Sequence, residues 1–383
     1  MTDRILYLGE NLQKDSHTEE FIHELRSYFK SVYPINYTNL YAKKGMQEAE
    51  NHILKMLEEK RIDYIFFSPG ESCLLRLNFF KEIRLSNEKI KLVTIFSDPE
   101  ALFFENDIYY AQASDVAWIF NPAMKNIFES YQVTTIYGQL FDKEKYLEIT
   151  KHDYEQNIEI SFIGGEYRSN RREFIQCVEE TYKNFYLAGF GTKKGWISTT
   201  KKNEIISRSK IHLNFSGVHS TQKGIHNRMT QLKGRLYEIV LLGSLPISEY
   251  GIGLDIRYRN EIPTFKNKKE MMDLIEFYIK NPDKRLEKIA KLKEIVNDEH
   301  NTEKIIGKLL SALKSSSSVL TYEQDTIFIR RFMAVRFYYL GFFILRPNKL
   351  IIELKLIFKH LKHIRVRMLW QIVRGFVNSY RGN

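Results

Sequence analysis

The sequence SKIHLNFSG, residues 209–217, is followed after a polar loop by KGRLYEIVLLGSLPI, residues 233–247. The segment Ile211–Phe215 (IHLNF) in the first stretch predicts a buried β-strand. The second stretch predicts a helix over Arg235–Leu242 and a further strand over Leu245–Ile247. Two apolar strands joined through a helix indicate a βαβ unit with parallel strands.

The same alternation extends along the chain in both directions from this unit. It begins at Arg4–Leu8, restarts at Glu159–Ile163 and ends with predicted helices up to Leu313. We therefore predict an α/β fold with two tandem Rossmann-like domains, each a parallel sheet with helices on both faces. The predicted ranges are 1–150 for the N-terminal domain, 151–314 for the C-terminal domain and, after the four serines Ser315–Ser318, 319–383 for a basic amphipathic helical tail. The further strands predicted in the first half are Tyr33–Asn39, Asp63–Phe67, Lys91–Phe96, Val116–Phe120 and Thr134–Tyr137.

The whole net charge of +11 lies in the last 58 residues, because Thr326 to Asn383 contain twelve Lys and Arg but a single acid, Glu353. Apolar residues from Leu350 to Met368 recur every three or four positions, as on one face of a helix. A cationic amphipathic helix on a neutral body predicts binding to the anionic face of a membrane. The alternatives are a helical hairpin packed on the body or a homo-oligomer formed through the tail. Nucleic acid is disfavoured as a partner because the body is not basic.

The remaining bulk features predict a cytoplasmic protein attached peripherally to the inner face of the cell membrane. Cys73 and Cys177 lie far apart and lack metal-ligand spacing, which favours a reducing compartment. The chain starts with an apolar strand and has no signal-peptide core. Its longest apolar run, Phe337–Leu345, is about half of the roughly 20 residues that span a bilayer.

One motif, Arg235-Leu236-Tyr237-Glu238 followed by Gly243 and Leu245-Pro246-Ile247, resembles the donor-binding segment of GT-B glycosyltransferases of the group 1 type. It is most similar to the CgeB-like group. The resemblance extends over roughly residues 158–312, whereas in residues 1–150 only the fold pattern and the Ser97-Asp98-Pro99 corner fit. It implies two domains facing each other across a cleft, with the acceptor on the first and the nucleotide-sugar on the second. No G-x-G-x-x-G fingerprint or Walker loop is present, which argues against a dinucleotide oxidoreductase and a P-loop kinase.

The resemblance also implies roles for two residues of this motif. Glu238 is expected to accept hydrogen bonds from the ribose hydroxyls, and a solvated or helix-capping Glu238 is the alternative. Arg235 is expected to stabilise the diphosphate, whose charge grows as the glycosyl bond breaks.

Five more residues are candidates for the donor site. Gly164 and Gly165 close a strand and allow a backbone to approach a phosphate, and Arg171 opens the helix that follows. Lys210 matches a lysine of the family, and a surface lysine is the alternative. Phe190, between two glycines, is expected either to stack on the nucleobase or to pack in the core.

On the acceptor side, Asp98 is the candidate catalytic base, and the alternative is an aspartate that braces its own turn before Pro99. Gly9 and His17 follow the first strand and are expected to line the acceptor site. No Asp-x-Asp pair occurs in the sequence, so we predict no metal and no cofactor.

The predicted function is transfer of a hexose-type sugar from a nucleotide-sugar to a glycan or lipid-linked glycan, with retention of configuration, in polysaccharide or lipopolysaccharide biosynthesis. A non-catalytic scaffold of the same fold docked on the membrane is the alternative.

Overall fold

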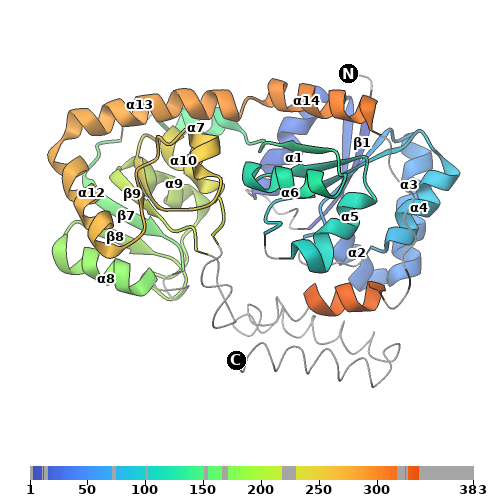
Figure 1. Ribbon diagram of the computed structural model, residues 1–383, viewed down its shortest axis with the longest axis horizontal. Coiled ribbons are helices and arrows are strands. Elements are labelled where there is room, and N and C mark those ends of the chain that lie inside the picture. The colour runs from blue at the N-terminus through green and yellow to red at the C-terminus, as the bar shows by residue number, and fades with distance from the viewer. Residues whose placement is uncertain are drawn as a thin grey trace. The chain divides into compact units, whose positions relative to one another are not determined.

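The computed structural model describes residues 3–10, 12, 16–70, 75–100, 102–150, 154–165, 171–217, 230–316, 324 and 327–335. These residues form two compact units (Figure 1). The first contains Met1–Phe120, Met124–Gly138 and the described residues from Thr302 onward, and the second contains Asn121–Ala123 and Gln139–Asn301. Among the described helices, none combines the length and the apolar character that crossing a membrane requires.

The first unit is built on a six-stranded sheet in the order β2-β1-β3-β4-β5-β6. All neighbouring strands are parallel, and Ile5 of β1 is in register with Val32 of β2 and Tyr64 of β3. The strands are β1 (Arg4–Gly9), β2 (Ser31–Asn36), β3 (Tyr64–Phe67), β4 (Lys91–Phe96), β5 (Val116–Ile119) and β6 (Thr135–Tyr137). The helices are α1 (His17–Tyr28), α2 (Tyr37–Lys44), α3 (Met46–Lys60), α4 (Leu77–Ser86), the π-helical turn η1 (Phe103–Asp107), α5 (Ile108–Gln112), α6 (Lys125–Ser130) and α14 (Thr302–Ser315).

Aromatic side chains fill much of the core of this unit. Trp118 of β5 is fully buried, and its ring centroid lies 5.1 Å from that of Phe21 in α1 and 6.2 Å from that of Phe66 in β3. These contacts lock α1 onto one face of the sheet.

Helix α2 was not expected from the sequence, which predicted a strand up to Asn39. The strand β2 instead ends at Asn36, whose side-chain Oδ1 accepts a hydrogen bond of 2.9 Å from the Asn39 amide. This capping bond satisfies a free amide at the start of α2 and so favours a helix directly after the strand.

The second unit is built on a five-stranded parallel sheet in the order β11-β10-β9-β7-β8. Helices α8 and α12 pack against each other, and α7 and α13 both contact α10. The two parallel sheets confirm the predicted α/β fold class. The strands are β7 (Ile158–Ile163), β8 (Phe185–Ala188), β9 (Ser209–Asn214), β10 (Leu245–Glu249) and β11 (Thr264–Phe265). The helices are α7 (Lys143–Thr150), α8 (Arg171–Thr181), α9 (Thr199–Ser207), α10 (Arg235–Leu241), α11 (Leu254–Tyr258), α12 (Lys268–Lys280) and α13 (Pro282–Glu299), with the short 3₁₀ turn η2 at Pro122–Met124.

The boundaries of the units differ from the predicted ranges. The second unit starts at Gln139 and so includes α7, whereas α14 returns to the first unit. There α14 contacts β5 and β6, and the Thr302 hydroxyl donates a hydrogen bond of 2.9 Å to the Glu24 carboxylate of α1. Such a return cannot be read from local sequence patterns because it depends on contacts between distant segments.

Residues 327–335, which were predicted to belong to the tail, instead form a helix in the core of the first unit (the unlabelled dark-orange helix below α2 in Figure 1). The expected basic amphipathic helix after residue 335 lies outside the described residues. The buried apolar side chains of helix 327–335 are Phe328, Ile329, Phe332, Met333 and Val335.

Candidate functional site

Each sheet reverses its strand order at one point, and these points locate the candidate sites. In the first unit the chain goes from β1 to β2 on one side and continues with β3 on the other. In the second unit β8 and β9 flank β7 in the same way. Parallel α/β sheets bind ligands at the carboxyl ends of the strands beside such a switch point.

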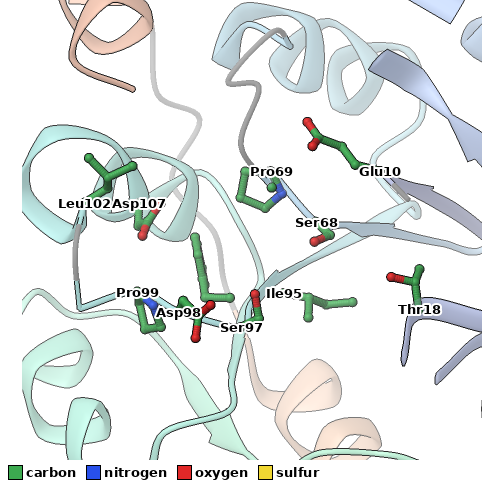
Figure 2. A pocket seen from close by; sticks show the side chains of 12 residues that line it. Glu10, Thr18, Ser68, Pro69, Ile95, Ser97, Asp98, Pro99, Leu102 and Asp107 are labelled. Atoms are coloured by element: carbon green, nitrogen blue, oxygen red, sulfur yellow. The ribbon is translucent and has the colours of Figure 1, made fainter. Parts of the chain in front are cut away.

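In the first unit this position is a pocket of about 210 Å³ at the carboxyl ends of β1, β3 and β4 (Figure 2). Among the described residues that line it, none is Lys, Arg or His. Its wall therefore has an acidic, hydroxyl-rich character. The polar side chains that line the pocket are Glu10, Thr18, Ser68, Ser97, Asp98 and Asp107.

Asp98 lies in this pocket, as the prediction for the acceptor side requires. Its side chain is exposed, and within the described part of the chain it has no hydrogen-bond or ion-pair partner. It therefore does not brace its own turn, which was the alternative for this residue. Its role as a catalytic base stays a prediction.

Gly9 and His17 lie beside the pocket, and their neighbours Glu10 and Thr18 line it. Gly9 is the last residue of β1, where an added Cβ atom would lie 2.5 Å from the ring of Tyr7. Close packing thus accounts for this glycine. His17 is the first residue of α1 and is exposed.

Asp107, the last residue of the π-helical turn η1, was not predicted from the sequence. Its side chain is 8% exposed and lines the pocket, and its Oδ1 accepts a hydrogen bond of 3.0 Å from the Asn106 amide. Burial raises the pKa of Asp107 to about 7, against the opposing effects of the Asn106 hydrogen bond and the charge of Arg331. Because π-turns often occur at functional sites and are invisible to simple periodicity, only the fold could reveal this residue.

In the second unit, the turns after β7 and β8 pack closely together. The Gly164 amide donates a hydrogen bond of 2.9 Å to the Ala188 carbonyl. A Cβ atom at Gly189, where φ is +124°, would lie 2.3 Å from the Gly164 carbonyl oxygen. Glycine is therefore needed for backbone packing at this edge.

Arg171 joins the turn after β7 to the turn after β9. The guanidinium is buried, and it donates hydrogen bonds to the carbonyls of Gly165 (3.4 Å), Phe215 (3.4 Å) and Gly217 (2.9 Å). These contacts give Arg171 a structural role at the predicted edge. A contact between Arg171 and a phosphate stays a prediction.

Arg235 and Glu238 both lie on α10, at the same edge as Gly164. Arg235 is half-buried and donates a hydrogen bond of 2.8 Å to the Ile163 carbonyl, where β7 ends. The Glu238 carboxylate is fully buried, and its Oε2 lies 2.6 Å from Nζ of Lys202. Glu238 is thus neither solvated nor open in this structure, and its binding to a ribose stays a prediction.

Lys202 was not identified from the sequence, because helix α9, on which it lies, was not predicted. Nearby, the Ser161 hydroxyl and His212 Nδ1 are 2.7 Å apart in the sheet. Burial, together with the charges of Arg235 and Lys202, lowers the pKa of His212 to about 3, so the ring is neutral. Among the described residues, this edge therefore combines the cations Lys202, Arg235 and the buried Arg171 with the Glu238 carboxylate, and the nearby His212 is neutral.

The two remaining donor-side candidates lie apart from this group. Lys210 is the second residue of β9 and so lies near its amino end, away from the turns of the candidate site. Phe190 follows β8 and is 38% exposed, which excludes the core position that was its alternative. Its stacking on a nucleobase stays a prediction. The polar loop before α10, residues 218–229, lies outside the described residues.

Comparison with known proteins agrees with this fold. Residues 168–311 match the model of the glycosyl transferase-like family. An alpha-glucosyltransferase in complex with UDP aligns with 82% of this chain and 100% of its own, with a TM-score of 0.55 and 10% identity. Sucrose-phosphate synthase from Thermosynechococcus elongatus aligns with 82% of this chain and 100% of its own, with a TM-score of 0.56 and 9% identity. Anabaena HepE in complex with UDP-glucose aligns with 82% of this chain and 99% of its own, with a TM-score of 0.57 and 12% identity. By sequence, no curated protein matches the chain. The chain has the GT-B fold of these structures.

Proposed function

We propose that this glycosyltransferase of the GT-B type transfers a hexose-type sugar from a nucleotide-sugar bound at the second unit to a hydroxyl group of an acceptor bound in the pocket of the first unit. The observation that most supports the proposal is the group formed by Arg235, Glu238 and Lys202 at the carboxyl edge of the second sheet. The match of residues 168–311 to a glycosyl transferase-like family covers this group.

The residues of this edge suit the chemistry of a nucleotide-sugar. The diphosphate becomes more negative as the glycosyl bond breaks, and a fixed guanidinium such as that of Arg235 stabilises this change more than it stabilises the ground state. The Glu238 carboxylate can accept hydrogen bonds from a ribose diol when the Lys202 ammonium turns toward the phosphates. Because these cations can neutralise the diphosphate and the sequence lacks an Asp-x-Asp pair, the proposed reaction needs no metal.

The pocket of the first unit suits an acceptor without negative charge. Its three carboxyl groups and its lack of described basic side chains would repel a phosphate or a uronate. Hydroxyl groups of a neutral glycan can instead donate hydrogen bonds to Asp98, Asp107 and Glu10. We therefore propose a neutral or amine-bearing glycan as the acceptor. Asp98 is the residue that we propose as the catalytic base.

Finer features of the proposal rest on the sequence. Residues 336–383 contain ten Lys and Arg and one acid, which favours peripheral attachment to an anionic membrane and a lipid-linked acceptor there. We also propose placement at the cytoplasmic face, in the synthesis of a surface polysaccharide, because the spacing of Cys73 and Cys177 favours a reducing compartment. Retention of configuration is proposed from the family resemblance.

The experiment that tests the donor proposal is isothermal titration calorimetry of the purified chain with UDP, UDP-glucose, ADP and GDP, each with and without EDTA. UDP is the first probe because HepE and the alpha-glucosyltransferase were each solved with it. We expect binding of one nucleotide that persists in EDTA and weakens in Arg235→Met. The matched control is Lys201→Met, an exposed lysine that pairs with Glu204 on the outer side of α9. Binding of none of the nucleotides would contradict the proposal and favour a non-catalytic scaffold.

A further inference from the structure

Helix 327–335 places a buried cation in the first unit. The Arg331 side chain is 1% exposed, and its guanidinium carbon lies 4.3 Å from the ring centroid of Tyr110 and 5.1 Å from that of Tyr109. Its Nη2 donates a hydrogen bond of 3.0 Å to Oδ1 of Asn106 in η1. Because a guanidinium stays charged when buried, this arginine is costly unless its surroundings compensate for the charge.

The hydrogen bond from Arg331 determines the orientation of the Asn106 amide. The amide oxygen faces the guanidinium, so the amide nitrogen faces the other way, where it donates a hydrogen bond of 3.0 Å to Asp107 Oδ1. Asp107 Oδ2 has no hydrogen-bond partner among the described residues, and the Asp107 side chain lines the pocket (Figure 2). The three side chains thus form a relay from the C-terminal helix to the pocket wall.

We propose that Arg331 is a positioning residue for the acceptor: acting through Asn106, it orients the Asp107 carboxyl so that Oδ2 receives a hydrogen bond from an acceptor hydroxyl. This role rests on the proposed function, since it assigns the pocket to the acceptor. The relay itself does not depend on that assignment. Helix 327–335 thus helps to shape the site, although residue 331 is 225 positions away from Asn106.

The relay predicts how the ionisation of Asp107 depends on Arg331 and Asn106. The Asn106 hydrogen bond and the positive charge of Arg331 both lower the pKa of Asp107, whereas burial and the charges of Glu100 and Glu105 raise it. Glu10 and Asp98 also line the same pocket. Removing the Arg331 charge should therefore move the titration of Asp107 to higher pH.

The test is carbon NMR of the full-length chain labelled at the aspartate carboxyl carbon, with the Asp107 signal assigned by its loss in Asp107→Asn. We expect a midpoint near pH 7 in the unmodified chain. In Arg331→Met the midpoint should rise by about one pH unit, the lower end of the effect of a nearby opposite charge. The matched control is Arg330→Met, which removes an exposed charge from the same helix and should leave the midpoint in place.

Asn106→Ala removes the residue that links Arg331 to Asp107, and it replaces Arg331→Met as the test variant if that protein does not fold. It removes a hydrogen bond that lowers the Asp107 pKa, so the midpoint should again rise. An unchanged midpoint in the folded variants would overturn the relay. UDP titration of the same proteins separates the two proposals. If the variants leave the Asp107 midpoint unchanged while the chain binds UDP, only the relay is refuted. If the midpoint rises in the variants but the chain binds no nucleotide, only the proposed function is refuted.

Discussion

Replacing Asp107 with Asn should stabilise the first unit, and the gain should grow with pH. The pKa of this buried carboxyl is raised from 3.8 to about 7 in the folded chain. Between these values the folded state holds a proton that the unfolded state has released, so the free energy of unfolding falls as pH rises. Above about pH 7 the loss is complete. A shift of about 3 units corresponds to about 4 kcal/mol, at about 1.4 kcal/mol for each unit.

Asn is nearly isosteric with Asp, keeps an acceptor for the Asn106 amide and never ionises. Asp107→Asn should therefore match the unmodified chain near pH 4 and exceed its stability by up to about 4 kcal/mol at pH 8. A site that lowers stability in this way is typical of a residue retained for function.

The assay is urea unfolding at pH 5, 6, 7 and 8, followed by tryptophan fluorescence. Trp118 is buried in the first unit, whereas Trp196 of the second unit is 71% exposed. A background with Trp196→Phe and Trp370→Phe leaves Trp118 as the only tryptophan, so the signal reports the first unit. The control is Asp98→Asn, an exposed carboxylate of the same pocket, for which we expect little change at any pH.

A difference between Asp107→Asn and the unmodified chain that stays constant from pH 5 to 8 would refute this account. So would a lower stability of the variant at pH 8. Either result would mean that Asp107 is not buried in the way that the pocket geometry requires.

Three further predictions concern the second unit and the C-terminal helix. Glu238→Gln should weaken UDP binding about tenfold or more, which is the usual effect of removing a charged hydrogen-bond partner. Unchanged UDP affinity in calorimetry would contradict the assignment of Glu238 to the ribose. Lys202→Met should destabilise the second unit by roughly 3 kcal/mol, because it leaves the Glu238 carboxylate buried without its cation; Lys201→Met should change the urea midpoint little. Truncation after Ser316 should lower the free energy of unfolding of the first unit by several kcal/mol, because the apolar burial of helix 327–335 is lost. Truncation after Val335 should leave the unfolding transition seen by Trp118 unchanged and abolish sedimentation with anionic vesicles. Equal unfolding midpoints for the two truncations would contradict the core position of helix 327–335.

The fold class and part of the site could be predicted from local patterns. Apolar runs such as Lys91–Phe96 predict buried strands because a strand covered on both faces needs side chains that avoid water. The strand ends then indicate where a ligand binds in a parallel sheet, and this reasoning led to Asp98 and Gly164, whereas Arg235 came from the resemblance to GT-B glycosyltransferases. These predictions depend only on residues within a few positions of each other.

The remaining features depend on contacts between distant segments and emerged only from the tertiary structure. The net charge of the last 58 residues identified a basic segment, but composition does not distinguish the exposed Arg330 from the buried Arg331. Composition likewise does not show that Asp107 and the Glu238 carboxylate are buried, or that Glu238 pairs with Lys202. Desolvation sets the ionisation and the orientation of such groups, and it arises only when segments far apart in the chain exclude water together. The sequence by itself therefore determined the α/β fold class and the strand ends at which ligand sites are expected, while the tertiary structure decided which charged side chains at those ends are buried.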